Sequence, residues 1–245
     1  MRAGWGTDDL DGRDLDGRDL DGRDLDCRDR THSLDGVPPL TVGFDLDMTL
    51  IDSRPGIHAA YRALTAKTGV WVDADLAVSR LGPPLRTELR EWFPPEQVEE
   101  AVTTYRTLYP DHAIAPSVPT PGAVEALAAV RARGLRVVVV TSKLGRLAEL
   151  HLAHLGMAAD ELAGDLFAEG KAAALTEHGV EWYVGDHRGD MVAARTAGVP
   201  GIGVATGPCD AGELWDAGAA YVLSDLTGFP ALLEKITVGR GSGAG

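Results

Sequence analysis

Two aspartates, Asp45 and Asp47, stand at the end of a short apolar run that begins at Leu40. Side chains two residues apart on a strand leave the same face, about 6–7 Å apart at a rise of roughly 3.3 Å per residue. A phosphorus atom fits between carboxylates at that separation. In an in-line displacement, one carboxylate can attack the phosphorus while the other protonates the departing oxygen. The pair therefore indicates phosphoryl transfer, with Asp45 and Asp47 as candidate catalytic residues.

A second acidic pair, Asp186 and Asp190, follows the apolar run at residues 182–184. The two aspartates are four residues apart, so a helix that begins here turns both side chains to one side. Gly185 removes a side chain where the backbone must come close to a ligand. Burying several carboxylates without a counter-charge is costly, so a cation is required. Oxygen-only ligands and a phosphate substrate favour Mg²⁺ as the cation that balances the charges of Asp45, Asp47, Asp186 and Asp190.

Hydroxyl side chains end another apolar run, at residues 135–140. Thr141 at this position can donate a hydrogen bond to a phosphate oxygen, and we take it as the preferred phosphate-binding candidate. Its neighbour Ser142 is the second candidate, and it also suits the N-cap of a helix.

The motif Asp45-Leu46-Asp47-Met48-Thr49 resembles D-x-D-x-T, the first motif of the haloacid dehalogenase-like (HAD) phosphohydrolases. Thr141 matches the second motif of that family, a single Ser or Thr. Lys171 matches the third motif, a lysine, although Ala172 follows it where many relatives have proline. Residues 185–190 are similar to the fourth motif, G-D-x-x-x-D, with both acidic positions intact. The resemblance covers residues 38–236.

The resemblance implies a role for each matching residue. Asp45 would be the nucleophile that forms an aspartyl-phosphate, and Asp47 the general acid and then base. Thr141 and Lys171 would bind the phosphate. Mg²⁺ would be held by Asp45, the backbone carbonyl of Asp47 and Asp186, with Asp190 nearby. The implied function is a Mg²⁺-dependent phosphatase for a small phosphomonoester, similar to the phosphoglycolate phosphatase-like branch.

Two alternatives share these motifs and stay open at this point. A phosphomutase resembling β-phosphoglucomutase would differ in needing a sugar bisphosphate primer. A non-catalytic phosphate-binding or regulatory protein could keep the same fold, and the altered context of Lys171 leaves room for it. Arg86, in the loop at residues 82–86, is a weaker candidate for contact with the leaving group.

The order of elements predicts an α/β fold. Strands alternate with helices, which implies a doubly wound, mostly parallel sheet whose strands end at one edge, a Rossmann-like arrangement. We expect this core at residues 37–52 and 119–238, with strands at 135–140, 165–168, 201–205 and 220–223 and a last helix at 226–236. Residues 53–118 show only helical spacing, and the resemblance implies that this insertion is an all-helical cap over the site.

Both chain ends differ in composition from the rest. Residues 9–28 repeat the pentapeptide Asp-Leu-Asp-Gly-Arg, with too few apolar side chains to offset the entropy of ordering, so we expect residues 1–36 to be disordered. Residues 239–245 are expected to form a flexible tail. Two cysteines, Cys27 and Cys209, cannot build a disulfide framework.

Charge and hydropathy narrow the classes of partner. The chain has 245 residues and a net charge of −14, which disfavours nucleic acid. No apolar run approaches the roughly 18 residues of a membrane span, and the first thirty residues lack the apolar segment of a secretory signal. We therefore expect a cytoplasmic monomer or homodimer that acts on a small phosphorylated metabolite.

Overall fold

The computed structural model describes residues 40–167 and 169–241. The expected disordered repeat at residues 1–36 lies outside this range. The central sheet has six strands in the order β5-β4-β1-β6-β7-β8, and every neighbouring pair is parallel. The strands are β1 (Thr41–Phe44), β4 (Arg136–Val140), β5 (Glu161–Ala163), β6 (Val180–Gly185), β7 (Gly201–Val204) and β8 (Tyr221–Leu223). The predicted α/β fold with a parallel sheet is confirmed.

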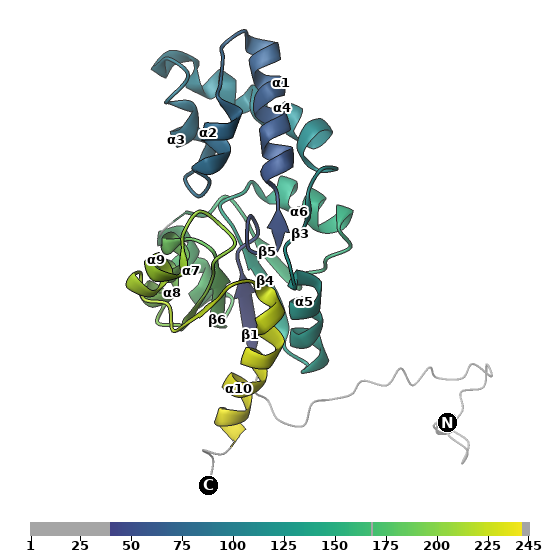
Figure 1. Ribbon diagram of the computed structural model, residues 1–245, viewed down its shortest axis with the longest axis vertical. Coiled ribbons are helices and arrows are strands. Elements are labelled where there is room, and N and C mark those ends of the chain that lie inside the picture. The colour runs from purple at the N-terminus through teal and green to yellow at the C-terminus, as the bar shows by residue number, and fades with distance from the viewer. Residues whose placement is uncertain (1–39, 168, 242–245) are drawn as a thin grey trace, which may run out of the picture. The chain divides into compact units, whose positions relative to one another are not determined.

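Helices cover both faces of the sheet (Figure 1). Val137 and Val139 of β4 face α5 (Ala123–Ala132), α6 (Gly145–His154) and α10 (Phe229–Gly241), whereas Val138 and Val140 face α7 (Glu169–Glu177) and α8 (Arg188–Ala197). This alternation is the two-residue period of a strand buried on both sides, and it explains the run of four valines. A further helix, α9 (Ala211–Asp216), packs through Leu214 beside α8.

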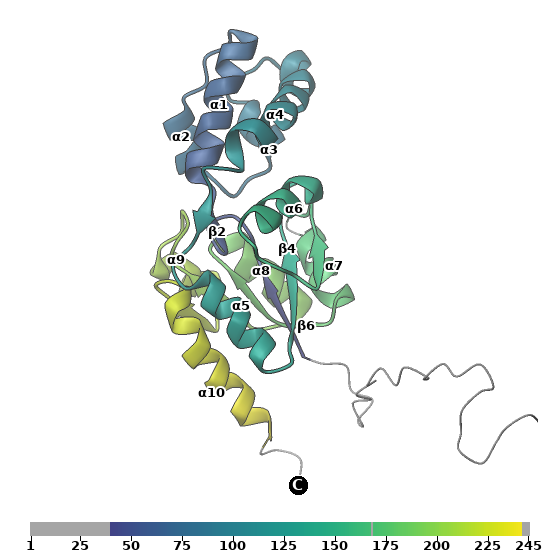
Figure 2. The ribbon, with the colours of Figure 1, turned by 90° about the vertical axis from the view of Figure 1, so that its right-hand side faces the viewer.

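The insertion between β1 and β4 is helical, as expected. It contains α1 (Arg54–Thr68), α2 (Ala74–Ser79), α3 (Leu85–Leu89), a 3₁₀ turn η1 (Pro95–Gln97) and α4 (Val98–Ala113), which group together in Figure 2. These helices share a hydrophobic cluster, which also includes Leu147 of α6. A short antiparallel ribbon of β2 (Ile51–Asp52) and β3 (Val118–Pro119) connects them to the core. We call residues 53–118 the cap.

Two expected elements differ from the structure. The prediction of a strand at 165–168 is wrong, because the strand in this region, β5, lies earlier in the sequence. It is an edge strand with half-buried side chains, so its sequence shows no strong apolar pattern. Phe167, in the segment where the strand was expected, is 45% exposed. The last helix runs from Phe229 to Gly241, beyond the expected end at residue 236 and into the first residues of the expected tail, after a 3₁₀ turn η2 (Leu226–Gly228).

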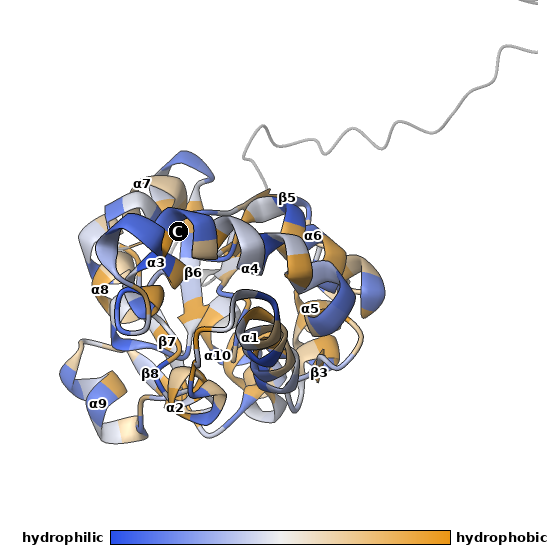
Figure 3. Cartoon of the chain, turned by 90° about the horizontal axis from the view of Figure 1, so that it is seen from above, coloured by the Kyte–Doolittle hydropathy of each residue, from blue (hydrophilic) through white to orange (hydrophobic). Residues whose placement is uncertain are grey.

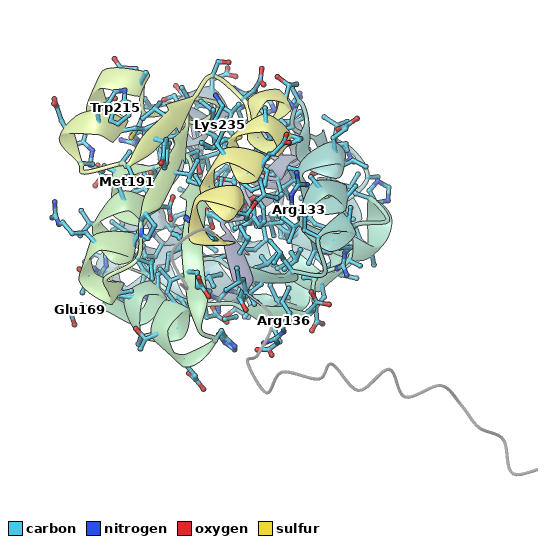
Figure 4. The ribbon with its side chains drawn as sticks, turned by 90° about the horizontal axis from the view of Figure 1, so that it is seen from below. Arg133, Arg136, Glu169, Met191, Trp215 and Lys235 are labelled. Atoms are coloured by element: carbon cyan, nitrogen blue, oxygen red, sulfur yellow. The ribbon has the colours of Figure 1, made fainter. Side chains whose placement is uncertain are left out.

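The two ends of the strands differ in their chemistry. Arg136, the first residue of β4, is labelled in Figure 4, which views the core from the end where the strands begin. The acidic residues of interest follow the opposite ends of the strands.

Figure 3 shows mixed hydrophobic and hydrophilic stretches along the surrounding helices, as expected when one side of each is buried. Within residues 40–167 and 169–241, no helix is both long and apolar enough to cross a membrane.

Candidate active site

The structure brings the four predicted aspartates and Lys171 to one pocket of about 280 Å³ at the carboxyl ends of the strands. Asp45 directly follows β1, and Asp186 directly follows β6. Asp190 lies in the first turn of α8. One carboxylate oxygen from each of these three residues lies within 4.8 Å of the others. Residues that are 145 positions apart in sequence therefore converge because parallel strands end at a common edge.

Two glycines make room for the carboxylates. A Cβ atom on Gly185 would overlap the side chain of Asp190, and one on Gly207 would overlap the carboxylate of Asp186. The close approach expected at Gly185 is thus toward an acidic side chain of the site. Thr49 adds a hydrogen bond from its Oγ1 to Oδ1 of Asp186, at 3.1 Å. The backbone and hydroxyl contacts fix where Asp186 points.

Lys171 supplies positive charge to this cluster. Its Nζ lies 3.0 Å from Oδ1 of Asp45 and 2.7 Å from Oδ1 of Asp190, and the lysine side chain is only 7% exposed. The hydroxyl of Tyr183 donates a second hydrogen bond to Oδ1 of Asp190, at 3.3 Å. One lysine cannot neutralise three buried carboxylates. Burial, together with the charges of Asp190 and Asp47, accordingly raises the pKa of Asp45 to about 7 despite Lys171.

The cluster fits a divalent cation. Oδ1 of Asp45 is buried, and although it lies near Lys171 it accepts no hydrogen bond from any residue in the described range. Burial and the charges of Asp190 and Asp45 raise the pKa of Asp186 well above its ordinary value. Three buried carboxylates whose charge a single lysine does not balance suit a divalent cation that prefers oxygen ligands. Asp45, Asp186 and Asp190 would hold the ion. The side chain of Asp47 instead contacts Ser53 and Lys143.

Asp47 is held through one of its two carboxylate oxygens. Its Oδ1 accepts a hydrogen bond from Ser53 Oγ at 2.5 Å and lies 3.0 Å from Nζ of Lys143. Burial raises the pKa of Asp47, but the charge of Lys143 and the hydrogen bond from Ser53 outweigh it, so the pKa lies below its ordinary value. Oδ2 receives no hydrogen bond from the described residues and remains available to a ligand in the pocket.

Of the other predicted site residues, Ser142 and Arg86 line the pocket and Thr141 does not. Ser142 lines it, whereas Thr141 is buried at the end of β4, with its Oγ1 accepting a hydrogen bond from the backbone N–H of Lys143. Arg86 lines the cap side, where its guanidinium forms two hydrogen bonds with Glu99, at 2.6 and 2.7 Å. Arg86 is therefore engaged in an exposed ion pair.

Sequence reasoning missed several residues of the site. Lys143 lies in the segment Thr141-Ser142-Lys143, directly after the buried strand β4. That position could have identified it as a site residue, but the sequence prediction used only the two hydroxyls of the segment. Ser53 and Tyr109 carried no signal, because nothing in the sequence indicates that they face Asp47 or Lys143. His187, which caps α8 by accepting the N–H of Gly189, also lines the pocket.

Comparison with known proteins gives consistent matches. A family model described as haloacid dehalogenase-like hydrolase matches residues 42–195, and a related model matches residues 171–229. The chain is 31% identical over 232 residues to phosphoglycolate phosphatase of Agrobacterium fabrum, covering 84% of this chain and 97% of that protein. A crystal structure of a predicted phosphatase from Clostridium acetobutylicum superposes with a TM-score of 0.70 at 25% identity, covering 80% and 99% of the two chains.

A shorter match reaches higher identity. The chain is 37% identical over 129 residues to the tyrosine-protein kinase PtkA of Mycobacterium tuberculosis. This match covers 52% of the chain and spans less than half, 44%, of the length of PtkA.

Proposed function

The chain belongs to the haloacid dehalogenase-like hydrolase family, and from this premise we propose that it is a Mg²⁺-dependent phosphatase acting on a small phosphomonoester. One observation carries the proposal: Asp45 and Asp47 line the same pocket, with Lys171 beside Asp45 and Lys143 beside Asp47. The phosphoglycolate phosphatase of Agrobacterium fabrum makes phosphoglycolate the first substrate to test.

The proposed reaction has two steps. A carboxylate oxygen of Asp45 attacks the phosphorus, and the bond to the bridging oxygen breaks. That oxygen leaves as an alcohol with a proton from Asp47, which is ionised in the free protein and takes up this proton when the negatively charged phosphate binds beside it. Water then attacks the acyl phosphate, giving up a proton to Asp47, and releases inorganic phosphate with Asp45 restored. Each step conserves charge and protons, because Asp47 gives a proton in the first and takes one in the second.

The remaining groups stabilise negative charge. Lys171 lies beside Asp45, so its ammonium balances charge on the nucleophile and on the phosphoryl oxygens. Ser142 lines the pocket and can donate its hydroxyl proton to a phosphoryl oxygen, and Thr141 remains the predicted donor from the end of β4. Bound Mg²⁺ would supply Lewis-acid stabilisation of the phosphoryl oxygens.

The experiment compares wild-type protein with Asp45→Asn on a panel of phosphomonoesters, with and without Mg²⁺. We expect hydrolysis that needs Mg²⁺ and that falls by roughly a hundredfold or more in the variant, because an amide is a far poorer nucleophile than a carboxylate. Asp216→Asn, at an exposed position on α9, is the matched control and should behave as wild type. Equal rates in wild type and Asp45→Asn would reject the proposal.

The same panel separates other phosphoryl-transfer activities. A phosphomutase would isomerise a sugar phosphate only when primed with a bisphosphate. A protein kinase, the activity named for PtkA, would move phosphate from ATP to tyrosine. Acid quenching during turnover, followed by mass spectrometry of the peptide that contains Asp45, should find one added phosphoryl group in the wild type and none in Asp45→Asn.

A further inference from the structure

Four polar side chains, Asp47, Lys143, Tyr109 and His151, form a line of contacts that passes through the cap. Nζ of Lys143, in the segment after β4, lies 3.0 Å from Oδ1 of Asp47 and 2.6 Å from the hydroxyl of Tyr109. That hydroxyl lies 3.0 Å from Nε2 of His151 in α6. Tyr109 belongs to α4 of the cap, whereas the other three belong to the core. The helices α4 and α6, which can be followed in Figure 2, are in contact. The line of side chains therefore crosses between cap and core.

The chemistry of the groups fixes the direction of the two hydrogen bonds of Lys143. An ammonium can only donate, so the Tyr109 oxygen and Oδ1 of Asp47 both accept from Lys143. Burial and the charge of Lys143 lower the pKa of His151 to about 4, which keeps the imidazole neutral. The direction of the hydrogen bond between Tyr109 and His151 is set by the tautomer of the imidazole. Lys143 is therefore the donor that links Tyr109 to Asp47.

Tyr109 limits the freedom of Lys143 in two ways. Its hydroxyl takes one of the three N–H donors, and its ring lies 4.7 Å from Nζ, close enough for a cation–π contact. The Lys143 side chain is 7% exposed, and four rotatable bonds would otherwise leave its ammonium several positions. Tyr109 is itself fixed by ring contacts with Tyr105 at 5.5 Å and His151 at 5.7 Å.

The orientation of Asp47 depends on this fixed ammonium. Lys143 and Ser53 both contact Oδ1, so Oδ2 is the oxygen of Asp47 that a ligand in the pocket can use. A carboxyl group that rotates cannot deliver its proton in the geometry that a leaving group needs, and misplacement by about 1 Å can cost roughly a hundredfold in rate.

We propose that Tyr109 is a positioning residue for the acid–base step: through Lys143 it holds Oδ1 of Asp47 and keeps Oδ2 directed at the leaving group. This inference rests on the proposed phosphatase function. It also gives the cap a part in catalysis, because the core alone supplies Asp47 and Lys143 but lacks the hydroxyl that fixes the lysine. Removing that hydroxyl disturbs protonation of the leaving group and leaves attack by Asp45 intact.

The test is Tyr109→Phe, which keeps the ring and removes the hydroxyl. We measure kcat/KM for alkyl phosphates, whose leaving oxygen needs a proton, and for p-nitrophenyl phosphate, whose leaving group is stable as an anion. We expect kcat/KM to fall about tenfold or more for alkyl esters and about twofold or less for p-nitrophenyl phosphate, because general acid catalysis matters only for the first. Tyr221→Phe, on β8 and 41% exposed, is the matched control and should leave both values unchanged.

Lys143→Met should reproduce this dependence on the leaving group, and the double variant Tyr109→Phe/Lys143→Met should be no worse than Lys143→Met alone, because both changes act through one contact. Melting temperatures show that each variant is folded. An equal loss for both ester classes, or no loss in either, would overturn the inference and give Tyr109 a packing role. Failure of the proposed function itself looks different, since wild-type protein would then hydrolyse neither ester, or Asp45→Asn would retain full activity.

Discussion

Gly207 is the residue at which the geometry of the site is least tolerant of change. A Cβ atom here would overlap Oδ2 of Asp186, and this carboxylate also accepts a hydrogen bond from Thr49. Gly207→Ala should therefore displace Asp186 and lower the affinity for Mg²⁺ by about 10- to 100-fold, as changes beside a metal ligand commonly do. Isothermal titration with Mg²⁺ measures the effect. Gly145→Ala is the control, since a Cβ atom there meets nothing within 4 Å, and an unchanged affinity in Gly207→Ala would contradict the assignment of Asp186 as a ligand.

Single residues also show what sequence reasoning could and could not find. Asp45, Asp47, Asp186 and Asp190 were predictable because each follows an apolar strand, and the ends of parallel strands meet. Gly207 was not, because its reason for being glycine is a side chain 21 positions away in sequence that reaches it only in the folded chain.

At the scale of elements, α6 joins the hydrophobic clusters of core and cap. Its Leu147 packs with the cap residues, whereas Ala148 and Leu152 pack in the core. Leu147→Ala should lower the free energy of unfolding by about 2–4 kcal/mol, because it leaves a cavity between two clusters. A thermal melt should show a lower Tm by roughly 4–12 °C. Leu150→Ala, on the same helix and 42% exposed, is the control and should change the free energy by less than about 0.5 kcal/mol.

The elements themselves were predicted unevenly, for physical reasons. The strand β4 was clear because four consecutive valines are buried on both faces of the sheet. The edge strand β5 was misplaced because it has one neighbouring strand, β4, and side chains that are only half buried, so no apolar pattern marks it. The ribbon of β2 and β3 was not expected at all, since two residues on each side are too few to show a period.

At the scale of the whole molecule, we expect the acidic cluster to make the stability of the fold depend on pH and on a bound cation. Burial and the charges of Asp190 and Asp47 hold the pKa of Asp45 near 7, and the pKa of Asp186 is also raised. In the unfolded chain both carboxyls lose their protons near the ordinary value of 3.8. Between pH 3.8 and about 7, the native protein binds more protons than the unfolded chain. The stability that the two protonated groups provide at low pH is therefore lost as the pH rises through about 7.

The proposed Mg²⁺ should reverse this loss, because it would bind the ionised carboxylates and would do so only in the folded protein. We expect MgCl₂ to raise Tm by several degrees more at pH 8 than at pH 6, relative to protein in EDTA. Subtracting the Tm in EDTA from the Tm in MgCl₂ at each pH cancels the titration of groups that do not contact the ion, such as His151. Asp45→Asn removes one of the titrating carboxyls and should flatten the difference. Equal gains in Tm at both pH values would show that protons and the cation do not compete for these oxygens, and that the cluster is not where the metal binds.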